Sequence, residues 1–136
     1  MVCLATGTGF APLKSIVEDL IKRGNKRALH LYWGSRRRRD LYLVDLPQKW
    51  AARTAWFRFI PVLSEPEADW NGAVGLVHHA ALRDFADLSG RQVYACGNPR
   101  MIRQARRDFV STAGLNESDF FADPFVPSGN DRAIPG

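Results

Sequence analysis

Short apolar runs alternate with segments of helical periodicity along most of the chain. The apolar runs predict strands near residues 2–5, 28–33, 57–63, 92–96 and 119–122. Segments in which apolar residues recur every three or four positions predict helices near residues 10–24, 47–53, 75–87 and 99–113. Such alternation is typical of right-handed crossovers, which build a parallel sheet covered by helices on both faces. We therefore expect an α/β fold with a single doubly wound, five-stranded parallel sheet.

The first predicted strand runs into a glycine-containing turn, and a helix follows directly. This turn reads Thr6-Gly7-Thr8-Gly9-Phe10-Ala11-Pro12. Its glycines can take positive φ angles and expose backbone N–H groups at a helix start, an arrangement that binds a pyrophosphate. The usual dinucleotide fingerprint has a third glycine where this chain has Pro12. Proline suits the first turn of a helix because its missing N–H leaves no partner unsatisfied.

A second strand-to-helix junction lies roughly ninety residues later. Here the apolar run that starts at Val93 ends in Cys96-Gly97-Asn98, and a helix opens at Pro99. Ligands of a doubly wound sheet bind outside the carboxyl ends of the strands, at the switch point between the first and fourth strands. Both glycine motifs fall at that edge. We expect them to face one ligand, although each motif alone could be a plain turn.

Together the two motifs resemble the pyridine-nucleotide-binding module of the ferredoxin–NADP reductase superfamily. Three further segments are similar to it and follow in the family's order: Leu29–Arg36, Phe57–Ser64 and Asp119–Phe125. Residues 121–128 resemble the tails of phenol hydroxylase reductase components and of CDP-6-deoxy-glucoseen reductases. The resemblance implies the strand order 3-2-1-4-5 for the sheet. It also implies hydride transfer from NADH to an FAD held by another domain, with single electrons then passing to an iron–sulfur centre.

The resemblance also implies roles for single residues. Cys96 is expected to face the nicotinamide carbon that gives up hydride and to position the ring, without acting as a nucleophile; the alternative is a buried apolar cysteine. Ser64 is expected to approach the adenosine ribose, and Phe10 and Phe125 to pack near the nicotinamide and flavin rings. The expected cofactor-binding set is Thr6, Gly7, Thr8, Gly9, Phe10, Pro12, Gly34, Arg36, Ser64, Glu65, Cys96, Gly97, Asn98, Pro99, Met101 and Phe125.

The residue after Ser64 bears on the choice between NADH and NADPH. Family members that select NADPH often have an arginine there, whereas this chain has Glu65. A carboxylate repels a 2′-phosphate and accepts hydrogen bonds from ribose hydroxyls. Glu65 therefore favours NADH, and Arg36 keeps NADPH open as the alternative.

Charge and histidine patterns leave further alternatives. Four consecutive arginines, Arg36–Arg39, read as a solvated loop with one arginine near the nucleotide, as a docking surface for an acidic redox partner, or as a nucleic-acid contact. The last is disfavoured, because the run follows a predicted strand end. The adjacent His78 and His79 would point about 100° apart on a helix, so no metal site is expected. The four tryptophans are interpreted as packing residues.

Composition agrees with one globular α/β domain. The chain has 136 residues, of which 46% are hydrophobic and 24% charged, and no apolar run reaches the length of a membrane span. Two cysteines are too few for a disulfide framework, which favours the reducing cytoplasm. We expect a NAD(P)H-binding domain over 1–126 and a tail over 127–136, with the FAD-binding and ferredoxin domains absent from the chain. A non-catalytic nucleotide-binding or interaction module is the alternative.

Overall fold

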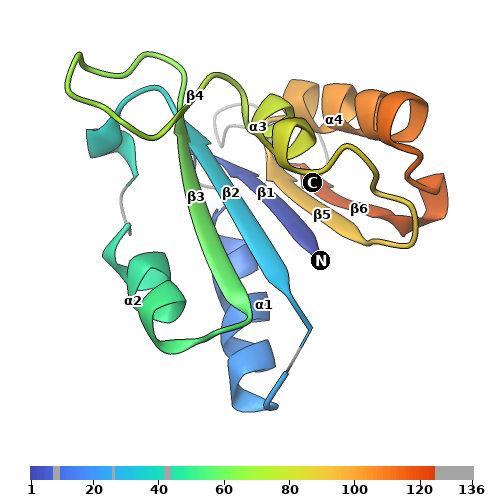
Figure 1. Ribbon diagram of the computed structural model, residues 1–136, viewed down its shortest axis with the longest axis horizontal. Helices are drawn as coiled ribbons and strands as arrows, with labels where there is room; N and C mark the ends of the chain where they lie inside the picture. Colours follow the sequence, from blue (N-terminus) through green and yellow to red (C-terminus); the bar gives the residue numbers. More distant parts are fainter. Residues whose placement is uncertain (8–9, 26, 42–43, 125–136) are drawn as a thin grey trace, which may run out of the picture.

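The computed structural model describes residues 1–7, 10–25, 27–41 and 44–124 and shows a parallel sheet with helices on both faces (Figure 1). Within these residues six strands lie in the order β4-β3-β2-β1-β5-β6. The strands are β1 (Val2–Thr6), β2 (Leu29–Ser35), β3 (Phe57–Leu63), β4 (Ala73–Val74), β5 (Val93–Gly97) and β6 (Phe120–Pro124). The helices are α1 (Phe10–Lys22), α2 (Asp45–Arg53), α3 (Val77–Asp84) and α4 (Pro99–Ala113). Short 3-10 helices span Arg38–Asp40 and Glu117–Asp119.

The predicted fold class and strand order are confirmed, since the five expected strands are β3-β2-β1-β5-β6 in space. The predicted number of strands is wrong, because β4 adds a sixth at the edge beside β3. A strand of two residues is too short to show the periodicity from which strands are predicted. Helix α3 is also shorter than the predicted 75–87, since the chain is already extended at Phe85.

Strand β1 lies inside the sheet and is buried on both faces. Val2 and Leu4 belong to the core under α3 and α4, whereas Cys3 and Ala5 belong to the core under α1 and α2. All four side chains are fully buried. A continuous apolar run of this kind is what a parallel sheet covered by helices requires.

Helix α4 is amphipathic and has a defined start and end. Its buried residues recur at helical spacing, and they are Met101, Ile102, Ala105, Phe109 and Ala113. Asn98 caps its N-terminus, and Gly114 ends it in the left-handed conformation with φ of 71°. No helix in the described ranges is both long and apolar enough to cross a bilayer.

The register of the central strands brings three chain segments to one edge. Thr6 of β1 lies opposite Gly34 of β2, and Ala5 lies opposite Cys96 of β5. The turns that follow these strands therefore leave the sheet at the same level, on its carboxyl edge. Parallel α/β sheets bind their ligands at this edge.

Candidate functional site

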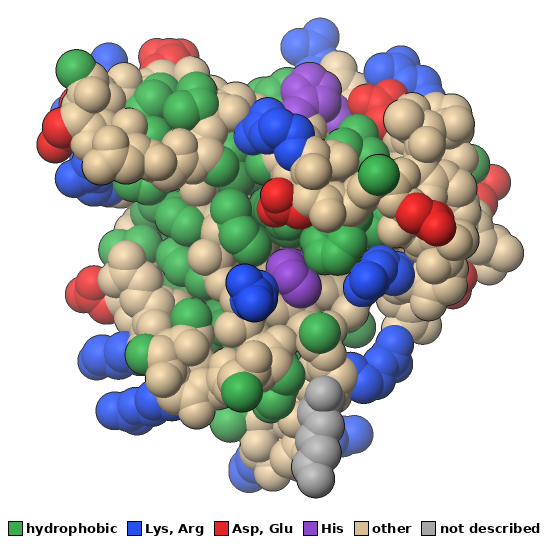
Figure 2. Space-filling view, viewed as in Figure 1, with side chains coloured by type: hydrophobic (Ala, Val, Ile, Leu, Met, Phe, Trp, Pro, Cys, Tyr) green, Lys and Arg blue, Asp and Glu red, His purple; other side chains and the backbone are tan. Residues whose placement is uncertain are grey.

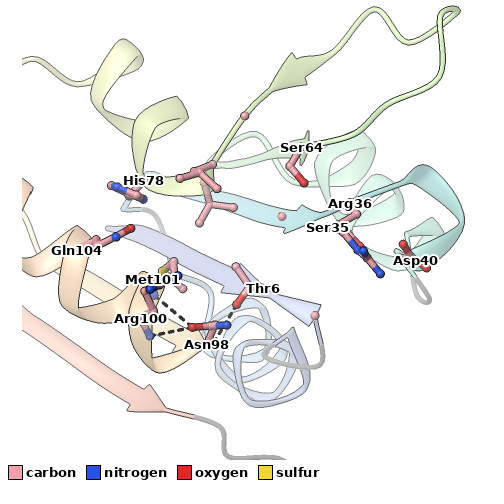
Figure 3. A pocket seen from close by; sticks show the side chains of 15 residues that line it. Thr6, Ser35, Arg36, Asp40, Ser64, His78, Asn98, Arg100, Met101 and Gln104 are labelled. Atoms are coloured by element: carbon pink, nitrogen blue, oxygen red, sulfur yellow. Dashed lines mark hydrogen bonds between the residues drawn. The ribbon is translucent and has the colours of Figure 1, made fainter.

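A hollow of about 640 Å³ opens at the carboxyl edge, between the ends of β1 and β2 and the first turns of α3 and α4 (Figure 3). The predicted site residues that line it are Thr6, Gly7, Gly34, Arg36, Ser64, Asn98 and Met101. The lining residues that sequence reasoning missed are Ser35, Asp40, Gly75, Leu76, Val77, His78, Arg100 and Gln104. Arg100 and Gln104 could have been predicted, because they lie four residues apart, and so on one face, in the helix that follows the second motif.

Other predicted site residues lie near the hollow without lining it. Phe10 is fully buried in the core, and Pro12 lies in the first turn of α1. Glu65 is exposed outside the hollow. Cys96 and Gly97 end β5, and Pro99 opens α4. Three predicted residues lie outside the described ranges: Thr8, Gly9 and Phe125.

Thr6 and Asn98 join the two glycine motifs. The backbone N–H of Asn98 donates to Oγ1 of Thr6 at 2.9 Å. The Asn98 side chain then turns to its own helix, where Oδ1 accepts from the N–H of Arg100 at 2.8 Å and of Met101 at 3.4 Å (Figure 3). The end of β1 and the start of α4 are thus held as one unit at the floor of the hollow.

The glycines at the strand ends permit close packing. A Cβ on Gly97 would lie 2.3 Å from Oγ1 of Thr6 and 2.8 Å from its carbonyl oxygen, and Gly97 has φ of 129°. A Cβ on Gly34 would lie 2.3 Å from Cγ1 of Val77. Neither position has room for a larger residue. Gly34 and Gly97 therefore serve the contact of β2 with α3 and of β5 with β1.

The turn after β1 rests on an aromatic stack. Gly7 has φ of 54°, and its carbonyl accepts a hydrogen bond from Nε1 of Trp33 at 3.1 Å. Phe10 stacks on Trp33 with ring centroids 4.3 Å apart and an interplanar angle of 10°. Phe10 is thereby committed to the core. The Phe10 side chain does not line the hollow.

The four-arginine run divides into residues with different partners. Arg36 lines the hollow, as expected. Arg37 and Arg38 turn toward the acidic loop that follows β3: Arg37 lies 3.9 Å from Glu67, and Arg38 lies 3.7 Å from Asp69. The Arg38 guanidinium also stands over the Trp70 ring at 5.3 Å. Exposed pairs of this kind contribute little stability, but they direct two of the four arginines away from the hollow.

The charged groups of the hollow are Arg36, Asp40 and Arg100 among the described residues. Figure 3 shows Asp40 beside Arg36 at the outer end, near Ser64. Oδ2 of Asp40 accepts from the backbone N–H of Arg37 at 3.3 Å, which holds the short 3-10 helix in place. Glu65 contributes its backbone N–H to the carbonyl of Arg36 and not its carboxylate. The carboxylate in the hollow is therefore Asp40.

Cys96 is fully buried at the end of β5, in the core under α1. Burial raises the pKa of its thiol to about 12, with a further contribution from the Asp123 carboxylate on the neighbouring strand. The thiol is therefore protonated at neutral pH. A thiolate is the nucleophilic form of cysteine, so this residue is unsuited to covalent catalysis.

A histidine pair meets a carboxylate at one side of the hollow. His78 is buried, and its Nε2 lies 3.4 Å from Oδ2 of Asp108 on α4. The His78 and His79 rings lie 4.2 Å apart, and donor atoms of the two histidines and Asp108 lie within 4.8 Å of one another. Sequence reasoning did not bring Asp108 to this place. Burial lowers the pKa of His78, and His79 adds to that effect, while Asp108 opposes it.

Basic side chains are distributed over the face that Figure 2 shows, with acidic side chains between them. A nucleic-acid-binding domain presents instead a basic stripe or patch. The net charge of +5 is thus not concentrated on this face.

Comparison with known proteins identifies the family. Residues 3–107 match the family described as Oxidoreductase NAD-binding domain. The chain belongs to this family. The match covers both glycine motifs and the strands between them, and the predicted resemblance to ferredoxin reductase-type proteins is confirmed.

The relatives of this NAD-binding domain are longer reductases, and the chain matches one part of each. It is 47% identical over 128 residues to the CDP-6-deoxy-L-threo-D-glycero-4-hexulose-3-dehydrase reductase of Yersinia pestis, covering 94% of this chain and 38% of the relative. It is 36% identical to the reductase component 2 of terephthalate 1,2-dioxygenase from Comamonas sp, covering 96% and 39%. The crystal structure of the Amycolatopsis cytochrome P450 reductase GcoB matches with a TM-score of 0.85 at 30% identity, covering 93% and 38%. The chain thus spans well under half of each.

Proposed function

We propose that this chain is the dinucleotide-binding module of a flavin-dependent oxidoreductase that passes hydride from NADH to FAD and electrons on to an iron–sulfur centre. The observation that carries the proposal is the junction of the two glycine motifs, where Asn98 donates to Thr6 at the floor of the hollow. Both motifs belong to one site at the ligand-binding edge of the sheet. The relatives, which are named as a reductase and as a reductase component, support the same proposal.

The hollow fits a dinucleotide. Its volume of about 640 Å³ lies within the usual range of small-molecule sites. A Cβ placed on Gly7 meets no atom within 4 Å, so the backbone of the turn is open to a ligand that approaches closely. When bound, the nicotinamide supplies the hydride. The protein supplies binding and orientation.

Each part of the site has its own role in this proposal. The Gly7 turn holds the pyrophosphate by backbone N–H groups at the start of α1. Ser64 and Asp40 accept or donate hydrogen bonds at the adenosine ribose. Cys96, a neutral thiol at the end of β5, positions the nicotinamide ring. None of these groups needs to change its protonation state.

NADH is the proposed cofactor because Asp40 places a carboxylate in the hollow beside Arg36. A carboxylate accepts hydrogen bonds from ribose hydroxyls and repels a 2′-phosphate. The proposed preference for NADH thus rests on Asp40 and not on Glu65. Arg36 is the residue through which NADPH would bind.

The rest of the reductase is proposed by analogy with the longer relatives. We assign residues 1–126 to the nucleotide-binding domain and 127–136 to a tail. A separate domain holds FAD, and an iron–sulfur domain or protein accepts the electrons. Two free, buried cysteines suit a reducing cytoplasm.

The test is calorimetric titration with ADP-ribose and with its 2′-phosphorylated form, which need no flavin. The proposal expects binding of both, with plain ADP-ribose preferred. Asp40→Asn should reduce the ratio between the affinity for plain ADP-ribose and the affinity for the phosphorylated form. Arg36→Gln should weaken binding of the phosphorylated ligand by about ten- to hundredfold, because it removes a charge-assisted contact. Arg39→Gln is the matched control, since Arg39 does not line the hollow.

A folded chain that binds neither ligand would overturn the proposal. A preference for the phosphorylated form would keep the dinucleotide site and reverse the choice of cofactor. The chain alone should show no NADH-dependent reduction of an artificial acceptor when free FAD is added. Turnover under those conditions would contradict the assignment of FAD to another domain.

A further inference from the structure

We propose that Trp33 is a positioning residue for the phosphate-binding turn and acts through the hydrogen bond from its indole N–H to the carbonyl of Gly7. The inference rests on the proposed function, because that function supplies the ligand of the turn. It differs from the prediction made from sequence, which interprets Trp33 as a packing residue only.

The Trp33 side chain reaches the turn from the buried, α1 side of the sheet. It lies on β2 opposite Ala5 of β1, and its side chain is fully buried on the α1 side of the sheet. Gly7 comes two residues after Ala5, where the chain has left the sheet. The Nε1–Gly7 oxygen distance is 3.1 Å. A buried indole on the neighbouring strand thus holds the first peptide of the turn.

The same indole also contacts the far end of the turn. Phe10 is the first residue of α1, and its ring stacks on Trp33 with centroids 4.3 Å apart. Trp50 backs Phe10 from α2 with centroids 5.9 Å apart. Trp33 therefore fixes both the carbonyl at which the chain enters the turn and the side chain with which it enters the helix.

The hydrogen bond to Gly7 sets the direction of a peptide plane. A trans peptide carries its carbonyl and its N–H on opposite sides. Holding the Gly7 carbonyl toward the core therefore orients the whole plane relative to the open side of the turn. Apart from its chain neighbours, no atom of the described residues lies within 4 Å of a Cβ built on Gly7, so the described residues offer no such support on that side. Orientation in advance of binding lowers the cost of ordering the turn around a phosphate.

A matched pair of variants separates this role from packing. Trp33→Phe keeps an aromatic ring for Phe10 and loses the donor. Trp50→Phe removes the same ring volume from the same core cluster, and Trp50 contacts Phe10 at the helix end of the turn. We expect Trp33→Phe to weaken ADP-ribose binding by about three- to tenfold, the usual value of one hydrogen bond. Trp50→Phe should stay within about twofold.

A sharper variant replaces Trp33 by 3-benzothienylalanine, which has the shape of tryptophan and sulfur in place of the N–H. It should keep the melting temperature of the wild type and still lose affinity for ADP-ribose. This variant decides the matter if Trp33→Phe does not fold. Equal affinity of the isostere and the wild type would overturn the proposal, as would equal losses in Trp33→Phe and Trp50→Phe.

The indole N–H gives a measurement that is independent of nucleotide. In the free protein labelled with ¹⁵N-tryptophan, the signal that Trp33→Phe removes should exchange slowly with solvent. Rapid exchange would overturn the bond itself. If the wild type binds no ADP-ribose while this signal is protected, the proposed function fails and the Trp33 bond stands. The two failures are thereby distinguished.

Discussion

The backbone N–H of Asn98 donates to the hydroxyl of Thr6 at 2.9 Å, although 92 residues separate the two in sequence. This bond joins the end of β1 to the first residue before α4. Each residue also serves the site in a second way, since Thr6 lines the hollow and Asn98 caps the helix. The bond lies where the proposed ligand must bridge the two motifs, so the geometry of the site depends on it.

Thr6→Val should separate the hydroxyl from the shape of the side chain. Valine leaves the Asn98 N–H without its partner, which should lower the free energy of unfolding by about 1–2 kcal/mol and weaken ADP-ribose binding. Thr6→Ser keeps the acceptor and is the control. Urea unfolding and calorimetry measure the two effects. Equal behaviour of the valine and serine variants would show that the hydroxyl does not support the site.

Gly97→Ala should be among the most damaging single-atom changes in the chain. Its Cβ would fall 2.3–3.0 Å from atoms of Thr6, and φ of 129° is unfavourable for any side chain. We expect a loss of about 3 kcal/mol or more in the free energy of unfolding. Gly24→Ala is the control, because Gly24 also has positive φ, at 72°, but has open space around it. Its cost should be about 1 kcal/mol. Similar costs for both variants would refute the packing argument.

Several features of the fold could be predicted because local patterns in the sequence determine them. The parallel sheet with helices on both faces could be predicted because apolar runs and helical segments alternate, and the strand order followed from the resemblance to a known family. The start of α4 at Pro99 could also be predicted, because proline suits the first position of a helix. The place of both motifs at one edge followed from the parallel arrangement.

Which side chains line the hollow depends partly on tertiary contacts and could not be predicted from the sequence. Asp40 enters the hollow because a short 3-10 helix turns back after β2. His78 enters it because α3 packs directly on Gly34. The Phe10 side chain lies outside the hollow because its ring stacks on the indole of Trp33. Neither periodicity nor motif spacing carries information on such contacts between separate segments.

His78 should make stability depend on pH. Burial holds the pKa of His78 below the ordinary value of 6.5, so the unfolded chain binds a proton that the folded chain does not. The contribution of His78 to the free energy of unfolding should therefore be constant above about pH 7 and fall as pH decreases through 6.5 toward the lowered pKa. His79 and Arg107 promote this effect, and Asp108 opposes it. Urea unfolding from pH 5 to 8 measures the slope.

His78→Asn should flatten that slope without removing it, because burial also lowers the pKa of His30. His30→Gln should remove its own share, and the double variant should remove both. Asp87 acts in a separate range, since hydrogen bonds from Ser89 lower its carboxyl pKa below the ordinary value of 3.8. A slope unchanged by His78→Asn would show that the folded protein binds this proton as readily as the unfolded chain.

The histidine pair should not bind zinc, although Asp108 brings a third donor near it. Tetrahedral zinc with bonds of about 2.1 Å brings its ligand atoms to about 3.4 Å from one another. The three donor atoms here spread over as much as 4.8 Å, which exceeds that spacing, although Nε2 of His78 and Oδ2 of Asp108 lie 3.4 Å apart. A histidine bound to metal also normally donates its second N–H, whereas Nδ1 of His78 is buried without a partner. Equimolar zinc should therefore shift the melting temperature by no more than about 1 °C, and removal of metal by a chelator should leave it unchanged. A zinc-dependent stabilisation that is lost in Asp108→Asn and kept in His30→Gln would show instead that the two helices close around the ion.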